Sequence, residues 1–395
     1  MAILGEVFSI IRNGASIKQI DGANGFPITR IETISNRVID RNRLGYANVF
    51  DITEYESYVL QSGDILMSHI NSEKHLGKTA LYIKKGNEKI IHGMNLLMLR
   101  ANSEVILPLY AKYFFDSNLF LKQIPNITKK SVNQASFTVT ALKKLEIKIP
   151  QMVEQKRIID IMSRLDNIIQ YRKDQLEKLD LFVKSRFIEM FGDVEESSKR
   201  WNTVYLEKVI QSIESGWSGN GIQRDKLEGE IAVLKVSAVT KGFFIPSECK
   251  VLEDQKNIKK YIYPHKDDLL FSRANTKEMV GATVIISKDF PELILPDKLW
   301  RIRFNELANI YFIKYVLSSR SIRNKLSSEA TGTSGSMYNI SMQKLKQLAI
   351  PLPPTDLQNN FAAFVSKIDK SKLAIQQSLD ELETLKKSLM QQYFL

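Results

Sequence analysis

Two segments of the chain carry hydrophobic residues at alternating steps of three and four positions, at residues 151–193 and 353–395. This spacing lines up apolar side chains along one narrow stripe of an α-helix and is typical of a coiled coil. A helix of roughly 35 residues, which each segment can accommodate, is about 50 Å long at 1.5 Å per residue. The predicted coiled-coil seam consists of Ile158, Ile161, Leu165, Leu176 and Leu179 in the first segment and Phe361, Phe364, Ile368, Leu379 and Leu382 in the second.

The two segments repeat one another at a constant offset of 203 positions. Identical residues recur without a gap, from Gln155 and Gln358 at one end to Phe191 and Phe394 at the other. An ungapped match over some forty residues indicates an internal duplication. A helix standing alone would expose its apolar stripe, so we expect the two copies to pack on each other. Approximate twofold symmetry favours an antiparallel pair. A parallel pair, or an ordinary amphipathic helix on a domain core, remains an alternative.

The regions before the two segments have the pattern of mixed α/β (α+β) domains. The same order of an apolar strand, a polar loop, a second strand and a helix is predicted at residues 65–67, 78–83 and 108–121, and again at 269–271, 281–286 and 309–317. We therefore predict a pseudo-twofold chain of four parts, namely a domain at 1–150, a helix at 151–193, a domain at 194–352 and a helix at 353–395.

Length and composition fit a protein of two domains. A chain of 395 residues is too long for one ordinary core. No run reaches the roughly 18 apolar residues of a membrane span, and the N-terminus has no pattern of a secretory signal. The single cysteine, Cys249, cannot form an internal disulfide, which fits a reducing compartment. These features predict a cytoplasmic location without a membrane partner.

The positive charge of the chain lies in the two predicted domains. The net charge is +12, and residues 1–150 and 194–352 each contribute +6, whereas both helical segments are neutral. Two equally basic domains on neutral spacers indicate a polyanion that is bound at two places. A generally basic protein without an anionic partner is the alternative that charge alone leaves open.

Motifs for catalysis or metal binding are missing from the sequence. There is no phosphate-binding Gly-x-x-x-x-Gly-Lys-Ser/Thr loop, no Asn/Asp-Pro-Pro-Tyr/Phe tetrad of an amino-methyltransferase, and no dinucleotide fingerprint in the glycine-rich residues 216–221. Four histidines and one cysteine do not assemble a zinc cluster at the usual spacings. We therefore expect a binding protein with no catalytic residues and no metal.

Two polar stretches in each domain have the composition of a nucleic-acid contact. Arg can bind guanine and Asn can bind adenine through two hydrogen bonds, while Lys, Ser and glycine-rich backbone suit phosphates. The candidate DNA-binding residues are Ser68, His69, Asn71, Lys74, Lys78, Lys129, Lys130, Asn133 and Gln134 in the first domain, and Arg273, Asn275, Thr276, Lys277, Thr331, Thr333, Ser334 and Ser336 in the second. Taken singly, each stretch can also be an ordinary turn.

In the order of its elements and in several short phrases, the chain resembles the specificity subunit of a type I restriction-modification system. The phrases are Gly-Asp-Ile-Leu at 63–66, Asp-Leu-Leu-Phe-Ser-Arg-Ala-Asn-Thr at 268–276, Ala-Thr-Gly-Thr-Ser-Gly-Ser at 330–336 and Ile-Pro-Leu-Pro-Pro at 350–354. The likeness covers essentially the whole chain. It departs at residues 149–152, where Ile-Pro-Gln-Met replaces a double-proline stretch.

The resemblance implies a division of labour between this chain and its partners. It implies two target recognition domains that read the two halves of a bipartite double-stranded DNA sequence, and helices that act as a spacer and as a dock for modification (methyltransferase) subunits, two of which are expected. Adenine methylation with S-adenosylmethionine would belong to those subunits, and ATP- and Mg-dependent translocation and cleavage to a restriction (motor/nuclease) subunit. A coiled-coil assembly adaptor without DNA specificity, and a self-contained nuclease, are the competing hypotheses.

Overall fold

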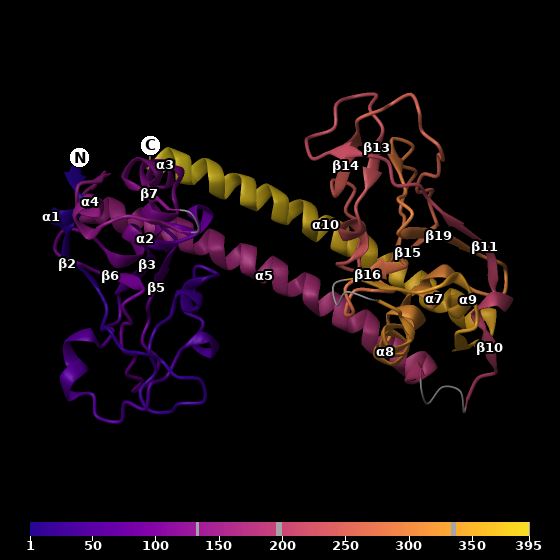
Figure 1. Ribbon diagram of the computed structural model, residues 1–395, viewed down its shortest axis with the longest axis horizontal. Coiled ribbons are helices and arrows are strands. Elements are labelled where there is room, and N and C mark those ends of the chain that lie inside the picture. Colours follow the sequence, from indigo (N-terminus) through magenta and orange to yellow (C-terminus); the bar gives the residue numbers. More distant parts are fainter. Residues whose placement is uncertain (132–133, 195–199, 333–336, 395) are drawn as a thin grey trace. The chain divides into compact units, whose positions relative to one another are not determined.

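The computed structural model describes residues 1–131, 134–194, 200–332 and 337–394 (Figure 1). The chain divides into two compact units that do not follow chain order. Unit 1 comprises Met1–Lys173 and Gln377–Leu395, and unit 2 comprises Asp174–Gln376. Each unit therefore contains one globular domain together with one end of each long helix.

Unit 1 is built on a four-stranded antiparallel sheet of order β2-β6-β3-β5. Its strands are β2 (Phe8–Asn13), β6 (Leu96–Ala101), β3 (Ile65–Ser68) and β5 (Thr79–Leu81). All four residues of β3 are buried, because alternate side chains enter two different cores. Ile65 and Met67 pack with the helices of the unit, whereas Leu66 packs with Tyr82 and Met98 on the opposite face of the sheet. A continuous apolar run is thus a strand that is covered on both faces.

Two helices follow the sheet in unit 1 where the sequence pattern predicted one. α2 (Pro108–Asp116) and α3 (Asn118–Ile127) replace the single helix predicted at 108–121. Ser117 has extended backbone angles, and its hydroxyl accepts a hydrogen bond from the backbone N–H of Phe120 at 3.3 Å. The single-helix prediction is wrong at this point because a serine N-cap starts a second helix.

The remaining elements of unit 1 are short, and those labelled η are 3-10 helices. They are β1 (Ala2–Ile3), α1 (Leu4–Val7), η1 (Ile31–Ile34), η2 (Arg41–Arg43), η3 (Thr53–Tyr58), β4 (Ile70–Asn71), η4 (Glu73–His75), β7 (Lys129–Lys130), β8 (Ala135–Ser136), α4 (Val139–Lys143) and β9 (Glu146–Ile147). β1 pairs with β9, which brings the start of the chain beside the strand that leads into the first long helix.

Unit 2 repeats this plan and adds a second four-stranded sheet. The repeated elements are β10 (Thr203–Tyr205), η5 (Leu206–Lys208), β11 (Ile210–Ser215), β15 (Leu269–Ser272), β16 (Ala274–Asn275), β17 (Thr283–Ile285), β19 (Leu299–Phe304), α7 (Ile310–Ser318), α8 (Arg320–Glu329), β20 (Tyr338–Asn339), α9 (Met342–Lys346) and β21 (Ala349–Pro351). The central sheet has the order β11-β19-β15-β17, which matches that of unit 1. The added elements are β12 (Gly221–Ile222), β13 (Ala232–Leu234), η6 (Val236–Val239), β14 (Cys249–Leu252) and β18 (Leu293–Ile294).

The two long helices contribute their ends to the cores of the units. They are α5 (Met152–Phe191) and α10 (Thr355–Phe394). In unit 1, Phe394 at the end of α10 is 1% exposed and its ring lies 5.3 Å from that of Tyr110. In unit 2, Phe191 at the end of α5 packs 4.9 Å from Phe312 and 5.6 Å from Phe361. Each domain core is therefore completed by the C-terminal end of the long helix that belongs to the other repeat.

Within each unit the contacts between α5 and α10 have an antiparallel order. In unit 1, Arg157 lies over the ring of Tyr393, whereas Lys173, farther along α5, pairs with Glu383, which is earlier in α10. In unit 2, Phe182 and Phe364 contact each other at a centroid distance of 5.3 Å, and Asp180 pairs with the later residue Lys372.

The predicted seam residues lie on the covered sides of the two helices but do not account for all of the burial. Buried among them are Ile158, Leu165, Phe361 and Leu379, and partly buried are Ile161, Leu176, Leu179, Phe364, Ile368 and Leu382. Met162 and Ile169 are also buried, and Met162 belongs to the domain core. The ends of the helices face both a helix and a domain, so their apolar surface is wider than a two-helix seam requires.

Candidate nucleic-acid interface

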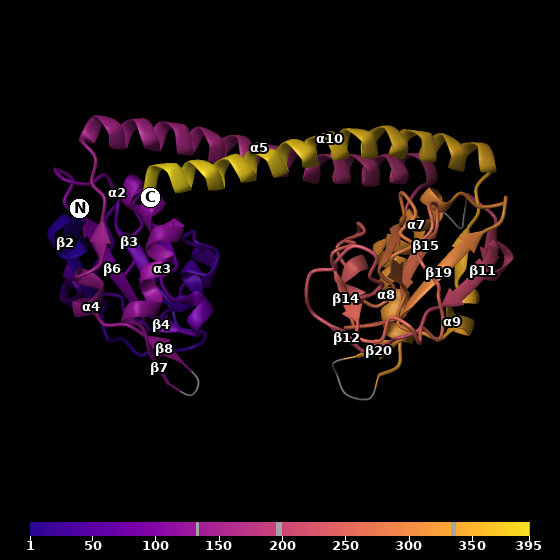
Figure 2. The ribbon, with the colours of Figure 1, turned by 90° about the horizontal axis from the view of Figure 1, so that it is seen from above.

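In unit 1 the two polar stretches that the sequence singled out are joined in one small sheet. β4, which carries Asn71, pairs with β8, and β8 pairs with β7, which carries Lys129 and Lys130. The partners are Asn71 and Ala135 in one ladder and Lys130 and Ala135 in the other. Within its unit, this hairpin lies at the end of the domain away from the long helices (Figure 2).

Unit 2 has the same arrangement. β16, with Asn275 as its last residue, pairs with β20, and Thr331 forms an isolated bridge with Asn339 of β20. β20 also lies at the end of its domain away from the helices (Figure 2). In each domain, residues more than fifty positions apart are thus held together by backbone hydrogen bonds. Asn133, Thr333, Ser334 and Ser336 lie outside the described residues.

Most of the candidate side chains on these sheets face solvent. The exposed ones are Lys74, Lys129, Lys130, Gln134, Thr276, Lys277 and Thr331. Lys130 forms an ion pair with Glu73 at 2.8 Å, and both side chains remain more than half exposed. Exposed lysines around a hairpin are suited to a phosphate backbone, because they keep their charge and can reorient.

Ser68 and His69 lie inside the first domain. Ser68 is 2% exposed and His69 is 5% exposed, with its ring edge toward Phe137. Burial lowers the pKa of His69 to about 4, so the imidazole is neutral at pH 7. A neutral, buried imidazole cannot attract a phosphate directly. Neither the Ser68 hydroxyl nor the His69 Nδ1 atom has a hydrogen-bond partner among the described residues.

Arg273 and Asn275 are held by their neighbours. The Arg273 Nε–H donates to the backbone oxygen of Asp297 at 2.9 Å, and the guanidinium carbon lies 6.0 Å from the centre of the Trp300 ring. Asn275 donates from Nδ2 to the Ser272 hydroxyl at 3.3 Å. The Arg273 Nη2 atom also lies 3.9 Å from the Asp297 carboxylate, and the side chain is 32% exposed, so part of the guanidinium group remains accessible to a ligand. Such anchoring limits the number of conformations that binding would have to select.

A segment that the sequence analysis did not single out lies beside the first loop. A pocket of about 400 Å³ opens between residues 31–43 and residues 68–78. Arg43 and Asn36 line it together with Asn71 and Lys78. The signal that could have found it is the run of Arg and Asn in Asn-Arg-Val-Ile-Asp-Arg-Asn-Arg at 36–43, which has neither helical nor strand periodicity.

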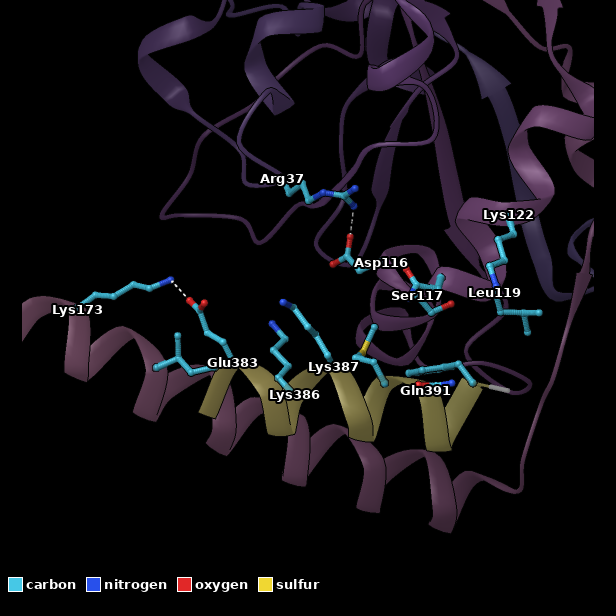
Figure 3. A pocket seen from close by; sticks show the side chains of 14 residues that line it. Arg37, Asp116, Ser117, Leu119, Lys122, Lys173, Glu383, Lys386, Lys387 and Gln391 are labelled. Carbon is cyan, nitrogen blue, oxygen red and sulfur yellow. Dashed lines mark hydrogen bonds and ion pairs between the residues drawn. The ribbon is translucent and has the colours of Figure 1, made fainter. Parts of the chain in front are cut away.

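A second pocket of unit 1 lies at the end of α10 (Figure 3). It has a volume of about 520 Å³, and Lys386 and Lys387 of α10 and Lys122 of α3 line it. Arg37, above α10, forms an ion pair with Asp116 (Figure 3). Lys386 also pairs with Asp166 of α5. This pocket belongs to the junction between the domain and the helices and lies among residues that the sequence analysis did not assign to DNA.

No metal site or membrane helix emerges in the part of the chain that the structure describes. There, no three His, Cys, Asp or Glu side chains are grouped so that they could hold a metal ion. None of the helices in the same residues has the length and apolar character that crossing a membrane requires.

The domain model for type I restriction modification DNA specificity matches the chain twice, at residues 2–180 and at residues 198–384. The chain belongs to this family. The putative MjaX specificity subunit of Methanocaldococcus jannaschii is 33% identical over 406 aligned positions, which cover 98% of this chain and 90% of that protein. The EcoKI specificity subunit of Escherichia coli is 23% identical over 309 positions, covering 72% of this chain and 64% of that protein.

Solved structures of the specificity-subunit family share the fold. The S subunit from M. genitalium superposes with a TM-score of 0.56 at 12% identity, and the match covers 100% of this chain and 95% of that one. A chain from a structure of a type I restriction-modification complex gives a TM-score of 0.52 at 18% identity, with 99% and 96% coverage. At 12% and 18% identity, these comparisons support a shared mixed α/β fold and nothing more specific.

Several residues of the phrases that carried the family resemblance have structural roles in this chain. Asp64 of the first domain is 1% exposed and receives two hydrogen bonds of 2.7 Å from Arg100. Its counterpart Asp268 is equally buried and accepts from Arg303 at 2.7 Å. The same carboxylates also accept from the backbone N–H groups of Gln61 at 2.7 Å and His265 at 2.8 Å, which fixes the turns before β3 and β15, the strands that lead to the candidate loops. In both domains of this chain, a buried carboxylate paired with an arginine thus supports the strand that leads to the candidate loops.

Buried glutamines fix the start of each long helix in the same way. Gln155 and Gln358 are both fully buried. Gln155 accepts from the N–H of Leu107 at 2.9 Å and donates to the carbonyl oxygens of Val105 and Pro150. Gln358 accepts from the N–H of Asn309 and donates to the carbonyl oxygens of Leu307 and Pro353. The repeat offset pointed to this pair, although the sequence did not indicate its role.

Proposed function

We propose that the chain is the sequence-specific DNA-recognition subunit of a type I restriction-modification complex and reads a bipartite target, one half-site per domain. The observation that carries this proposal is the joining of the two candidate stretches into one solvent-facing sheet in each domain. Each domain has a net charge of +6, which suits a polyanion. Membership of the type I restriction modification DNA specificity family also supports this proposal.

The residues divide into two proposed roles. Lys74, Lys129, Lys130 and Lys277 contact phosphates and set the position of each domain on the duplex. Asn71, Asn275 and the exposed part of the Arg273 guanidinium group contact base edges, since amide and guanidinium groups match adenine and guanine. Ser68 and His69 act from inside the first domain by supporting the loop, because burial keeps them away from the DNA backbone.

The long helices serve as the spacer and as the dock for modification subunits, two of which are expected. We propose that α5 and α10 form an antiparallel coiled coil over their length, which gives the chain its pseudo-twofold symmetry. This proposal is supported by the antiparallel order of the contacts inside each unit. We propose the corresponding division of the chain into four parts. The recognition domains comprise residues 1–150 and 194–352, and the long helical segments comprise residues 151–193 and 353–395.

Catalysis belongs to other subunits in this proposal. Adenine methylation with S-adenosylmethionine takes place on the modification subunits, and an adenine must leave the base stack for that reaction. ATP and Mg act on the restriction subunit. The recognition subunit holds the duplex while the base is extruded, and the complex works in the cytoplasm.

The test measures the binding of duplex DNA by the purified chain, with and without its modification subunit. Fluorescence anisotropy reports the affinity over a range of salt concentrations. We expect affinity that falls steeply with salt and a preference for one bipartite sequence that the modification subunit strengthens. A coiled-coil adaptor would show neither property. Cleavage of DNA by the chain alone in the presence of magnesium would instead support a nuclease.

A further inference from the structure

The pocket between residues 31–43 and residues 68–78 has the features of a base-reading site. Its floor includes Ser68, which is 2% exposed and whose hydroxyl has no hydrogen-bond partner among the described residues. The Nδ1 atom of His75, another lining residue, is likewise without a partner there. Buried polar atoms normally have partners in a folded protein, so two unpaired atoms in one pocket point to a ligand or ordered water.

The segment that forms the other side of the pocket is held firmly. Thr33 is fully buried, and its hydroxyl donates to the carbonyl oxygen of Arg43 and accepts from the N–H of Arg30, both at 2.9 Å. Arg37 has a left-handed backbone with φ of 60° and is tied to α2 through its ion pair with Asp116. A non-glycine residue persists in that conformation only where its surroundings fix it. The segment is thus preorganised before any ligand arrives.

Arg43 lines the pocket with a partly anchored guanidinium group. Its Nε atom lies 3.2 Å from Asp40, and its Nη1–H donates to the Ser35 hydroxyl at 3.1 Å. The side chain is nevertheless 51% exposed, and Nη2 has no partner in the described residues. Both N–H groups of Nη2 and the second N–H group of Nη1 stay available. Adjacent Nη1–H and Nη2–H groups can donate together to guanine O6 and N7.

A negatively charged side chain at the rim of the pocket favours a base edge over a phosphate as the ligand. Glu32 lines the same pocket, is exposed, and makes no ion pair in the described part of the chain. Ser35 links the two residues, because its hydroxyl accepts from Arg43 and donates to the backbone oxygen of Glu32 at 3.0 Å. A carboxylate that lines the same pocket repels a phosphate but can accept a hydrogen bond from the amino group of cytosine. A donor and an acceptor that line one pocket therefore suit the two halves of a G·C pair.

We propose that Arg43 and Glu32 read one G·C pair of the first half-site in the major groove, with Arg43 on guanine and Glu32 on cytosine. The proposal rests on the proposed DNA-recognition function. Asn71 belongs to both the pocket and the predicted loop, and its Oδ1 accepts from the N–H of Ser72 at 2.7 Å, which leaves its amide donor for the neighbouring base.

The test compares variants of the chain, each assembled with its modification subunit, in a binding selection from a random duplex library. The parent is expected to prefer G·C at one position of one half-site by about 5- to 150-fold. Arg43→Ala and Glu32→Gln should reduce the preference at that position to near unity and leave the other half-site unchanged. Arg43→Lys keeps the charge but lacks the fork, so it should lose the preference with little loss of overall affinity.

A control variant and two contrary outcomes separate this inference from the proposed function. Lys84→Ala removes an exposed cation of the same domain outside the pocket and should leave the base preferences unchanged. If Arg43→Ala weakens binding to all sequences equally, the side chain contacts a phosphate and the inference is overturned, while the proposed function stands. If the parent complex itself shows no sequence preference, the proposed function fails.

Discussion

Lys129 of β7 and Lys277, which follows β16, are exposed lysines of the two candidate interfaces. Neither side chain has an ion-pair partner in the described residues. We expect Lys129→Ala and Lys277→Ala each to weaken binding to all duplexes and to reduce the slope of log affinity against log salt by about 0.9, the value for one phosphate contact. The measurement is anisotropy at four or more salt concentrations. Lys370→Ala, which removes an exposed charge of α10, is the control and should leave the slope unchanged. An unchanged slope for both interface variants would place the DNA elsewhere.

Arg273 combines anchoring by Asp297 and Trp300 with a partly open guanidinium group. We predict that Arg273→Ala weakens binding and relaxes the preference in one half-site only, because the residue lies in the second domain alone. A competition assay with duplexes that differ in one half-site measures this effect. If affinity and both half-site preferences stay as in the parent, the assignment of this loop to the interface is wrong.

His69 makes the stability of the first domain depend on pH. Its pKa falls to about 4 in the folded chain because burial disfavours the imidazolium, while an unfolded histidine titrates near 6.5. The unfolded state therefore binds more protons between these values, and stability decreases as the pH falls through that window. We expect His69→Gln to remove about 2 kcal/mol of the stability difference between pH 7 and pH 5, measured by urea unfolding. Parallel losses in the variant and the parent would contradict this assignment.

The candidate site shows which residues pattern and composition can locate. Asn71 and Lys129 were found because polar residues directly follow or precede short strands. Ser68 and His69 were placed in the same loop by sequence, yet β3 continues through Ser68 and the chain enters β4 only at Ile70, so both side chains are covered. Arg43 was missed because its segment owes its shape to Thr33 and Asp40, contacts that no periodicity reveals.

At the scale of elements, the junction between domain and helix depends on one buried glutamine in each unit. Gln358→Leu keeps the size of the side chain but leaves the Asn309 N–H and the carbonyl oxygens of Leu307 and Pro353 without their partner. Each unsatisfied buried group costs about 1–3 kcal/mol, so we expect a total loss of about 3 kcal/mol or more. Thermal and urea unfolding of the variant provide the measurement.

The matched control for this substitution lies two positions away. Asn360 is exposed on the same turn of α10, so Asn360→Leu should change stability by less than about 0.5 kcal/mol. Equal effects of the two substitutions would show that the buried amide has no special role in joining the helix to the domain.

The sequence could predict those strands and helices whose hydrophobic residues recur with a strong periodicity. The strands at 65–67 and 269–271 and the two long helices appear as β3, β15, α5 and α10. The break between α2 and α3 was missed, because the hydrophobic pattern runs through Ser117 while the serine side chain ends one helix and caps the next. The small strands β4 and β16 have two residues each, too few for any alternation to be seen.

At the scale of the whole molecule, the compact units differ from the linear order that sequence suggests. The duplication at a constant offset identified two equivalent halves, but it could not assign the end of α10 to the first domain or the end of α5 to the second. Those assignments depend on Phe394 and Phe191 entering the cores, which aromatic composition alone does not indicate.

This exchange of helix ends predicts that the order of the halves along the chain is interchangeable. We expect a permuted chain that starts at Trp201, with the original ends joined by a flexible Gly/Ser linker, to fold with the thermal transition and DNA preference of the parent. Calorimetry and the binding selection described above measure both. A second permuted chain, opened inside α5 between Leu176 and Glu177, is the control and should lose stability because it breaks a continuous helix. If the first permuted chain is the less stable of the two, the prediction is wrong.

The burial of Phe394 also has a consequence for the history of such a chain. Because each domain is completed by a helix end from the other repeat, a single half would lack the aromatic side chains that close its core. Two identical halves could supply these side chains to each other. A gene for one half could therefore have encoded a symmetric dimer that recognises a palindrome, and fusion of two copies would then have let each domain diverge toward its own sequence.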